Sequence, residues 1–242
     1  MRTIAVAIFL ILYSIFTIPM VAIEWIVGKI SPEKHHIIAQ KCVVKGFKMI
    51  LHICGVKLTV KGQENIPKNQ AALFAYNHRS YFDILVGYVT APMRTSFVSK
   101  YEMLKVPMIS WWMKCMNCLF LDREDIKQGM KTILDGIELL KKGTSIYIAP
   151  EGTRSKNDEV HKFHEASFKL ADKSKTPIVP VCINNTDALF EKHEPWIHSG
   201  HVIIEYCEPI YMSDMDRDEK KHIGEKVRAI ISEKYKKNAK EI

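Results

Sequence analysis

The chain has 242 residues, 47% of them hydrophobic and 26% charged, which allows one substantial folded domain with an attached segment and excludes a disordered chain. Its 35 Lys and Arg residues outnumber its 27 Asp and Glu residues, giving a formal net charge of +8. This excess attracts phosphate-bearing partners, whether nucleic acid, anionic lipid or a phosphorylated substrate, and does not choose among them.

The first predicted element is a membrane-associated helix. Residues 3–23 form an uncharged run of 21 residues, and about 20 apolar residues are enough for a helix to cross the hydrocarbon core of a bilayer. Pro19 removes one backbone donor within this run, so we expect a kink there. A cleaved signal peptide is the less favoured alternative, because no small-x-small cleavage site follows the apolar residues.

A second helix is predicted to begin at Ser31 and Pro32, an N-cap residue followed by the residue preferred at the first helical position, and to end at Gly55. Four lysines share one face of it: Lys34, Lys41, Lys45 and Lys48. A basic stripe beside an apolar one is typical of a helix among lipid headgroups, and a surface helix with a solvated lysine face is the alternative. We therefore expect residues 1–54 to form a pair of membrane-associated helices at the cell membrane, with the rest of the chain on the cytoplasmic face.

After Gly55, short apolar runs alternate with longer helical patterns. The predicted strands are residues 56–60, 71–76, 96–99, 118–121, 145–149, 178–183 and 202–206, and the clearest helix is 125–142. This alternation predicts an α/β fold for residues 55–242, with a central mostly parallel or mixed sheet flanked by helices. We expect the charged segment from about residue 214 onward to be an amphipathic helix that frays, and we assign it no function.

The first candidate functional residues follow the predicted 71–76 strand. His78 and Asp83 are five residues apart and would lie about 140° apart on a regular helix, so they can meet only on a strand-to-helix turn. There Asp83 would lie near a helix N-terminus, which favours negative charge. A carboxylate that binds one imidazole nitrogen leaves the other as a base. No Gly-x-Ser-x-Gly motif occurs in the chain, so the nucleophile would be the hydroxyl of the substrate.

Two further groups of polar residues follow later strands. In the segment 150–155, Gly152 lets the backbone approach a ligand closely, and Arg154 offers paired donors for two phosphate oxygens. Lys100 and Arg123 end two other predicted strands. Since ligands of open α/β sheets bind outside the strand ends, these cations can face one mouth together with the histidine. For residues 150–155 the alternative is a polar turn that caps a strand. For Arg123 the alternative is a surface ion pair with Asp122.

Four blocks stand in one order: the His-x4-Asp motif of His78 and Asp83, Phe-Leu-Asp-Arg at 120–123, Pro-Glu-Gly-Thr-Arg at 150–154 and Ile-Val-Pro-Val at 178–181. Together they resemble the 1-acylglycerol-3-phosphate acyltransferase family, the lysophosphatidic acid acyltransferases, over roughly residues 56–206. The resemblance implies that His78 is a catalytic base and Asp83 its partner. It also implies phosphate contacts for Lys100, Arg123 and Arg154, and an acceptor site shaped by Glu151, Gly152 and Thr153.

The resemblance further implies a glycerolipid acyltransferase fold with a membrane-bound N-terminal helix pair. The expected reaction transfers a fatty acyl group from acyl-CoA or acyl carrier protein to the sn-2 hydroxyl of 1-acylglycerol 3-phosphate, giving phosphatidic acid for phospholipid synthesis. The expected partners are the bilayer, lysophosphatidic acid and the acyl donor, without nucleic acid. Two departures from the family pattern bear on acceptor or acyl-chain preference: Ala149 replaces a phenylalanine, and residues 163–166 read Phe-His-Glu-Ala instead of Phe-Lys-Lys-Gly.

Other motifs give little support to other chemistry. The chain has no Gly-x-Gly-x-x-Gly and no phosphate loop ending in Gly-Lys-Ser/Thr, and only Cys115 and Cys118 of its six cysteines stand close together. We therefore expect no metal and no cofactor besides the acyl donor substrate. The alternatives that stay open are the same chemistry on glycerol 3-phosphate or another lysophospholipid, and a non-catalytic, membrane-bound basic adaptor.

Overall fold

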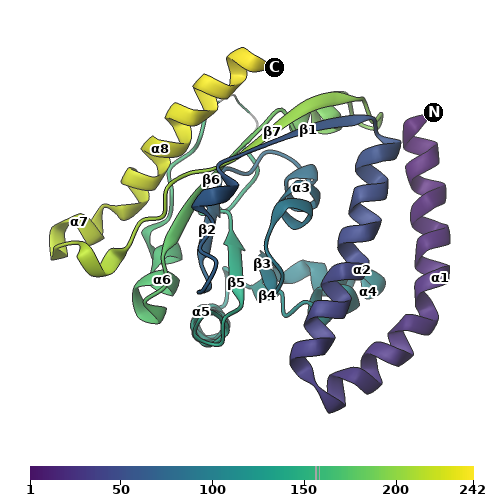
Figure 1. Ribbon diagram of the computed structural model, residues 1–242, viewed down its shortest axis with the longest axis horizontal. Helices are drawn as coiled ribbons and strands as arrows, with labels where there is room; N and C mark the ends of the chain where they lie inside the picture. The colour runs from purple at the N-terminus through teal and green to yellow at the C-terminus, as the bar shows by residue number, and fades with distance from the viewer. Residues whose placement is uncertain (156, 158) are drawn as a thin grey trace.

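The computed structural model describes residues 1–155, 157 and 159–242, with the side chains of all of these except residues 21, 22, 24–26, 32 and 33. The described residues form a seven-stranded sheet with helices against both faces (Figure 1). The strands are β1 Val56–Lys61, β2 Leu73–Tyr76, β3 Thr95–Lys100, β4 Leu119–Leu121, β5 Ser145–Ile148, β6 Ile178–Asn184 and β7 Gly200–Tyr206. Each lies within two residues of a predicted strand, so the predicted α/β fold is confirmed.

The helices are α1 Arg2–Ile30, α2 Pro32–Ile53, α3 Phe82–Thr90, α4 Pro107–Cys115, α5 Ile126–Lys141, α6 Lys169–Ser174, α7 Arg217–Lys221 and α8 Ile223–Asn238. Short 3-10 turns connect them at η1 Gln63–Asn65, η2 Tyr101–Lys105, η3 Glu165–Phe168, η4 Asp187–Leu189, η5 Glu191–His193, η6 Met212–Asp214 and η7 Ala239–Glu241. The helix predicted over residues 125–142 is α5, which the Asp125 carboxylate caps by accepting from the backbone N–H groups of Lys127 and Gln128.

The order of the strands brings the predicted site residues to one edge of the sheet. The strands are ordered β1-β7-β6-β2-β5-β3-β4, and each neighbouring pair is parallel except β6 with β7. Because β2, β5, β3 and β4 run in the same direction, their carboxyl ends lie at a common edge. The segments after these ends hold the polar groups identified in the sequence, at the place where open α/β sheets bind ligands.

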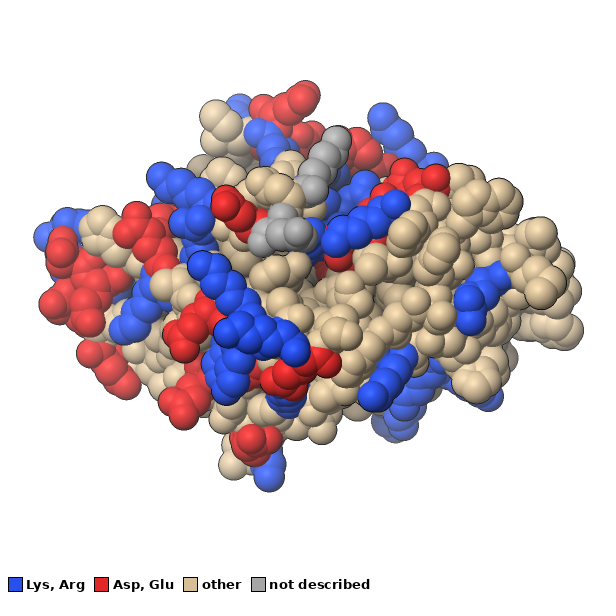
Figure 2. Space-filling model, turned by 90° about the horizontal axis from the view of Figure 1, so that it is seen from above, with Lys and Arg blue, Asp and Glu red and all other residues tan. Residues whose placement is uncertain are grey.

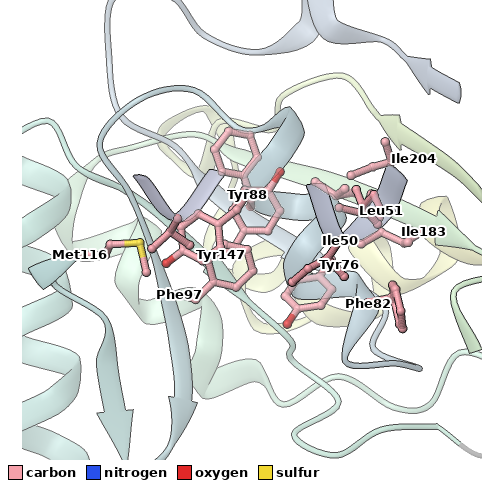
Figure 3. Packing of buried hydrophobic residues seen from close by; sticks show 14 of the residues in the cluster. Ile50, Leu51, Tyr76, Phe82, Tyr88, Phe97, Met116, Tyr147, Ile183 and Ile204 are labelled. Atoms are coloured by element: carbon pink, nitrogen blue, oxygen red, sulfur yellow. The ribbon is translucent and has the colours of Figure 1, made fainter. Parts of the chain in front are cut away.

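One face of the sheet carries an aromatic core. Phe97 stacks on Tyr147 with ring centroids 4.7 Å apart, and Tyr88 of α3 packs on Phe97 at 4.3 Å. Figure 3 shows these three rings lying together, beside Tyr76 at the end of β2. Helices α2, α3 and α4 cover this face, so the turn that leads from β2 into α3 begins on a rigid, buried platform.

The opposite face of the sheet packs against α5, α6 and α8. Val227 and Ile231 of α8 are completely buried, and they lie one helical turn apart on the side that faces β6. The expectation that the C-terminal segment frays is therefore wrong. The apolar stripe of α8 is narrow and flanked by charged residues, so it is difficult to recognise in the sequence. In the structure this stripe packs against β6.

The two N-terminal helices pack against each other, with α2 between α1 and the sheet domain (Figure 1). Pro19 lies within α1, and Figure 1 shows the helix bending in its second half, as expected. Helix α2 is docked on the domain: the Gln40 side chain donates to Pro92 O and accepts from the backbone N–H of Thr95, both at 3.0 Å. The four lysines of α2 are all exposed.

Charge is distributed unevenly over the molecule. On the face shown in Figure 2, the end formed by α1 and α2 is largely uncharged, whereas acidic and basic side chains crowd the opposite end. Many large apolar side chains of α1 are exposed, including Ile4, Ile8, Ile11, Ile15 and Phe16. An exposed apolar surface of this extent marks a surface that contacts something other than water.

Candidate active site

The centre of the candidate site is the turn between β2 and α3. His78 Nδ1 lies 2.9 Å from Asp83 Oδ2, and because a carboxylate only accepts, Nδ1 is the donor of this hydrogen bond. The His78 side chain keeps 19% of its surface exposed, whereas Asp83 is 1% exposed. Within the described part of the chain, His78 Nε2 makes no hydrogen bond. The structure therefore brings the two residues together and leaves the second imidazole nitrogen available as a proton acceptor.

Asp83 is surrounded by hydrogen-bond donors. Besides His78, its Oδ2 accepts from the backbone N–H groups of Arg79 at 2.7 Å and Ser80 at 2.8 Å. Its Oδ1 accepts from the hydroxyl of Thr186. Asp83 also lies in the first turn of α3, where the helix dipole favours negative charge. All of these contacts suit an ionised carboxylate that fixes the orientation of the imidazole ring.

Glu151 holds the backbone of the histidine instead of lining the mouth of the site. Its Oε1 accepts from the backbone N–H of His78 at 2.8 Å, and its Oε2 accepts from the backbone N–H of His161 at 2.9 Å. The residue is 6% exposed. Burial raises the pKa of the Glu151 carboxyl, and the hydrogen bonds from these two N–H groups partly oppose the rise. Ser155 N–H completes the clamp by donating to His78 O at 2.7 Å.

Gly152 and Arg123 come together although they follow different strands. Gly152 has a φ of +77°, and a Cβ atom at this position would lie 3.2 Å from Arg123 Nη1. The glycine is therefore required both by the left-handed backbone and by the guanidinium that lies against it. Thr153 beside it is exposed. The contact places the exposed Arg123 at the carboxyl end of β5, next to the segment that carries Arg154.

Arg154 is held in place by two neighbours. Its guanidinium lies over the ring of Tyr81, 4.0 Å from the centroid, and its Nη1 is 3.1 Å from Glu191 Oε1. The same Glu191 oxygen accepts from the backbone N–H of Tyr81 at 2.8 Å. The Arg154 side chain is still 35% exposed. It can therefore meet an anion while it stays in the position that Tyr81 and Glu191 define.

Lys100 lies at the end of β3, where it is exposed. In the parallel pairing of β3 with β4 it stands opposite Leu121, two residues before Arg123. The two cations thus follow the ends of neighbouring strands, at the same edge of the sheet as His78. Within the described part of the chain, Lys100 makes no hydrogen bond or ion pair with the other predicted site residues.

A segment that the sequence reasoning missed holds the other side of the β2–α3 turn. Four contacts join alternate residues of the turn to residues 183–191. Asn77 pairs with the backbone of Ile183, Arg79 with Asp187, Tyr81 N–H with Glu191 and Asp83 with Thr186. One signal for this segment was present: a run of four polar residues, 184–187, directly follows a buried strand.

Comparison with known proteins gives the family and relatives of this chain. The family model described as Acyltransferase matches residues 57–184, more than half of the chain. The 1-acyl-sn-glycerol-3-phosphate acyltransferase of Saccharomyces cerevisiae is 31% identical over 194 residues, covering 79% of this chain and 63% of the yeast protein. That of Borreliella burgdorferi is 32% identical and covers 60% of this chain and 58% of the relative. The chain thus spans about three fifths of the length of these two relatives.

Two other relatives match over most of their length. The 1-acyl-sn-glycerol-3-phosphate acyltransferase of Escherichia coli is 25% identical, over 81% of this chain and 80% of the relative. The crystal structure of the 1-acyl-sn-glycerophosphate acyltransferase PlsC from Thermotoga maritima is 26% identical, with a TM-score of 0.76 over 99% of this chain and 98% of that chain. The family match covers β1 to β6 and with them the turns that hold His78, Arg123 and Arg154, and on this ground the chain belongs to the acyltransferase family.

Proposed function

We propose that this protein transfers a fatty acyl group from an acyl thioester to the sn-2 hydroxyl of 1-acylglycerol 3-phosphate, forming phosphatidic acid. The observation that carries the proposal is the bond between His78 and Asp83, at an edge of the sheet that also presents Lys100, Arg123 and Arg154. The names of the relatives, which are 1-acyl-sn-glycerol-3-phosphate acyltransferases, support the same reaction.

The proposed reaction is a direct transfer. His78 Nε2 removes the proton of the acceptor hydroxyl as its oxygen attacks the thioester carbonyl carbon. Asp83 holds the imidazole by Nδ1 and stabilises the imidazolium that forms. The tetrahedral intermediate collapses with cleavage of the carbon–sulfur bond, and the leaving thiolate takes the proton back from the imidazolium. The product is an ester, and the enzyme returns to its starting state without a metal or other cofactor.

The three cations at the edge, of which Lys100 and Arg123 are exposed and Arg154 is partly exposed, bind the phosphate of the acceptor in this proposal. Arg154 is positioned by Tyr81 and Glu191, and Arg123 lies against Gly152, so both guanidinium groups have a defined place before the substrate binds. Preorganised donors lower the entropic cost of fixing the substrate. With the phosphate held, the sn-2 hydroxyl is confined to the neighbourhood of His78.

Helix α1 is the one helix among the described residues that is long and apolar enough to cross a membrane by length and composition, over Arg2–Met20. We propose that it enters one leaflet instead of crossing. It packs along α2, which is itself bound to Pro92 and Thr95 of the sheet domain. At its start, Thr3 Oγ1 accepts from the backbone N–H of Ile197 at 2.8 Å. A full crossing would therefore draw the polar domain into the hydrocarbon, at a large desolvation cost.

A panel of acceptors tests the proposed function. Purified protein in lipid vesicles is given a labelled acyl-CoA or acyl carrier protein with 1-acylglycerol 3-phosphate, glycerol 3-phosphate or a lysophospholipid with a larger headgroup. We expect labelled phosphatidic acid from the first acceptor and little product from the others. A preference for another acceptor would correct the substrate, and no acyl product from any acceptor would contradict the proposal in favour of a lipid-binding adaptor. A chelator should leave the rate unchanged.

A further inference from the structure

We propose that Thr186 is a positioning residue of the catalytic dyad, whose hydroxyl holds the Asp83 carboxylate in the orientation that His78 requires. The inference rests on the proposed acyltransferase function and adds a third side chain to its machinery. Thr186 belongs to the segment after β6, more than one hundred residues from Asp83 in the sequence, and it donates to Asp83 Oδ1.

The hydrogen bonds of Asp83 are divided unequally between its two oxygens. Oδ2 accepts three, from His78 Nδ1 and from two backbone N–H groups. Among the described residues, Oδ1 accepts one, from Thr186. Asp83 is 1% exposed and Thr186 is 0% exposed, so water has little access to replace that donor. The hydroxyl therefore decides whether Oδ1 is paired and whether the plane of the carboxylate is fixed.

Among the described residues, the Thr186 hydroxyl makes no hydrogen bond within its own loop. Thr186 precedes η4 at the capping position, but its side chain makes no capping hydrogen bond. The loop is held by other groups: Leu189 N–H donates to Thr186 O at 3.1 Å, and the Asn185 amide donates to His201 O at 3.0 Å. Asn185 adopts a φ of +67°, a left-handed conformation that asparagine tolerates. The backbone of the loop thus positions the Thr186 hydroxyl, and the hydroxyl donates its hydrogen bond to Asp83.

Loss of the hydroxyl should affect turnover more than binding. With Oδ1 unpaired, the carboxylate can rotate away from the imidazole, and stabilisation of the imidazolium that forms in the reaction is weakened. In the described structure, the cations expected to hold the acceptor phosphate, Lys100, Arg123 and Arg154, form no hydrogen bond with Thr186. A hydrogen bond to a charged group typically corresponds to a change of about 10- to 100-fold.

The test compares substitutions that differ in the hydroxyl alone. Thr186→Val keeps the shape and removes the donor, and we expect kcat to fall about 10- to 100-fold with the acceptor KM within about twofold. Thr186→Ser restores the hydroxyl and should recover most of kcat. If the valine variant does not fold, the pair Thr186→Ser and Thr186→Ala, which are alike in size, gives the same comparison. The matched control is Thr95→Val: Thr95 is also fully buried and donates to Pro92 O at 2.8 Å, but it begins β3 at the opposite edge of the sheet.

A double-mutant cycle separates this role from a general effect on folding. In an Asp83→Asn background, Thr186→Val should cause little further loss of kcat, because the carboxylate that it orients is gone. An equal loss in both backgrounds, or full kcat for Thr186→Val in the otherwise unchanged enzyme, would overturn the inference. Either result leaves the proposed function intact as long as the unchanged enzyme forms phosphatidic acid. Failure of the proposed function would instead show as no acyl transfer by the unchanged enzyme.

Discussion

His78 is fixed mainly through its own backbone. Its backbone N–H donates to Glu151, and its backbone C=O accepts from Ser155. Among the described residues, Asp83 is the one hydrogen-bond partner of its ring. A small movement of the backbone would therefore move the base relative to the substrate. Enzymes are sensitive to such displacements, because a reacting group must approach to about 3 Å. Glu151 therefore positions the backbone of His78, although the sequence resemblance implies a place for it in the acceptor site.

Replacement of Glu151 by glutamine tests that role. The amide side chain would have one acceptor oxygen and would turn its NH2 group toward one of the two N–H donors, leaving that donor buried and unpaired. We expect Glu151→Gln to lower kcat at least about tenfold with little change in the acceptor KM, and to destabilise the fold by about 1–3 kcal/mol. Steady-state kinetics and urea denaturation measure the two effects. Glu138→Gln, at an exposed position, is the control; a rise in KM with normal kcat would favour direct contact of Glu151 with the acceptor.

Arg154 should behave in the opposite way. Its guanidinium is partly exposed and is held by Tyr81 and Glu191, so its removal would take away the contact proposed for the phosphate of the acceptor. We expect Arg154→Ala to raise the acceptor KM about 10- to 100-fold while kcat changes little, since it binds the substrate before and during the reaction alike. Arg217→Ala on α7 removes an exposed cation that lies outside the predicted site residues, and this control should leave KM unchanged. A normal KM for the Arg154 variant would remove this residue from the phosphate site.

At the scale of elements, the segment 183–191 fixes the turn between β2 and α3 from one side. Its strongest contact is the buried pair of Arg79 and Asp187, with Arg79 Nη2 2.6 Å from Asp187 Oδ2. Arg79 also donates to the backbone O of Asn157, so it joins the loop after β5 to the same cluster. Lys192 approaches Asp187 to 3.0 Å. Burial opposes ionisation of Asp187, but the hydrogen bonds from Arg79 and Lys192 outweigh it and hold the pKa of Asp187 below its ordinary value.

This shift predicts a pH-dependent contribution to stability. A carboxyl whose pKa is lowered in the folded state stabilises the fold above its unfolded value of 3.8, and this stabilisation is lost as the pH falls through the lower folded value. We expect Asp187→Asn to destabilise the protein by about 3 kcal/mol at pH 7, as for other broken buried pairs. The difference from the unchanged protein should shrink as the pH falls below 4, measured by urea denaturation across the pH range. A constant difference would show that Asp187 acts through its shape instead of its charge.

The sequence is informative about elements and less so about the contacts between them. Buried strands appear as apolar runs, and a helix such as α5 carries its cap at Asp125 and its stop at Gly143, so both are visible locally. The spacing of His78 and Asp83 allows them to meet on a strand-to-helix turn, and the predicted strand before them indicated such a turn. The contacts of Thr186 and Asp187 with the turn do not follow from local spacing, because they depend on which strands become neighbours in the sheet. The polar run 184–187 marks the segment, but a single sequence gives no local signal for which residues it will contact.

The role of Glu151 was hidden for a similar reason. Its position within the Pro-Glu-Gly-Thr-Arg block was visible, but the direction of its side chain depends on where the backbone N–H groups of His78 and His161 come to lie in the fold. The C-terminal helix gave a different error. Its many charged residues suggested fraying, whereas Val227 and Ile231, two buried residues one turn apart, pack it against β6.

At the scale of the whole molecule, the apolar α1 and the basic face of α2 lie at one end of a charged domain. Apolar burial and attraction of lysines to anionic headgroups add together in membrane binding. Under the proposed function, this arrangement would bring the catalytic domain to the membrane surface, where a lipid acceptor and its product reside. The proposed insertion of α1 into one leaflet would do so without a crossing, because α1 packs on α2 and α2 is attached to the domain.

Lysine substitutions on α1 test the proposed insertion of this helix into the membrane. Ile11 and Ile15 are 62% and 55% exposed and lie one turn apart. Burial of each is expected to contribute about 1.5–3 kcal/mol, so Ile11→Lys with Ile15→Lys should weaken binding to vesicles at least about tenfold in co-sedimentation. The control is Leu134→Lys on α5, which is 60% exposed and lies outside the helix pair. Binding unchanged by the α1 substitutions, or weakened equally by the control, would contradict insertion of α1.

The most direct test of the account is the turnover of a His78→Ala variant. The unchanged protein and the variant, both in vesicles, are supplied with labelled acyl thioester and 1-acylglycerol 3-phosphate, and binding of the acceptor is measured alongside. We expect the variant to lose at least about a thousandfold in kcat, since the base is absent, while acceptor binding persists through the cations at the sheet edge. Phosphatidic acid formation by His78→Ala at the rate of the unchanged protein would show that this imidazole is not the base.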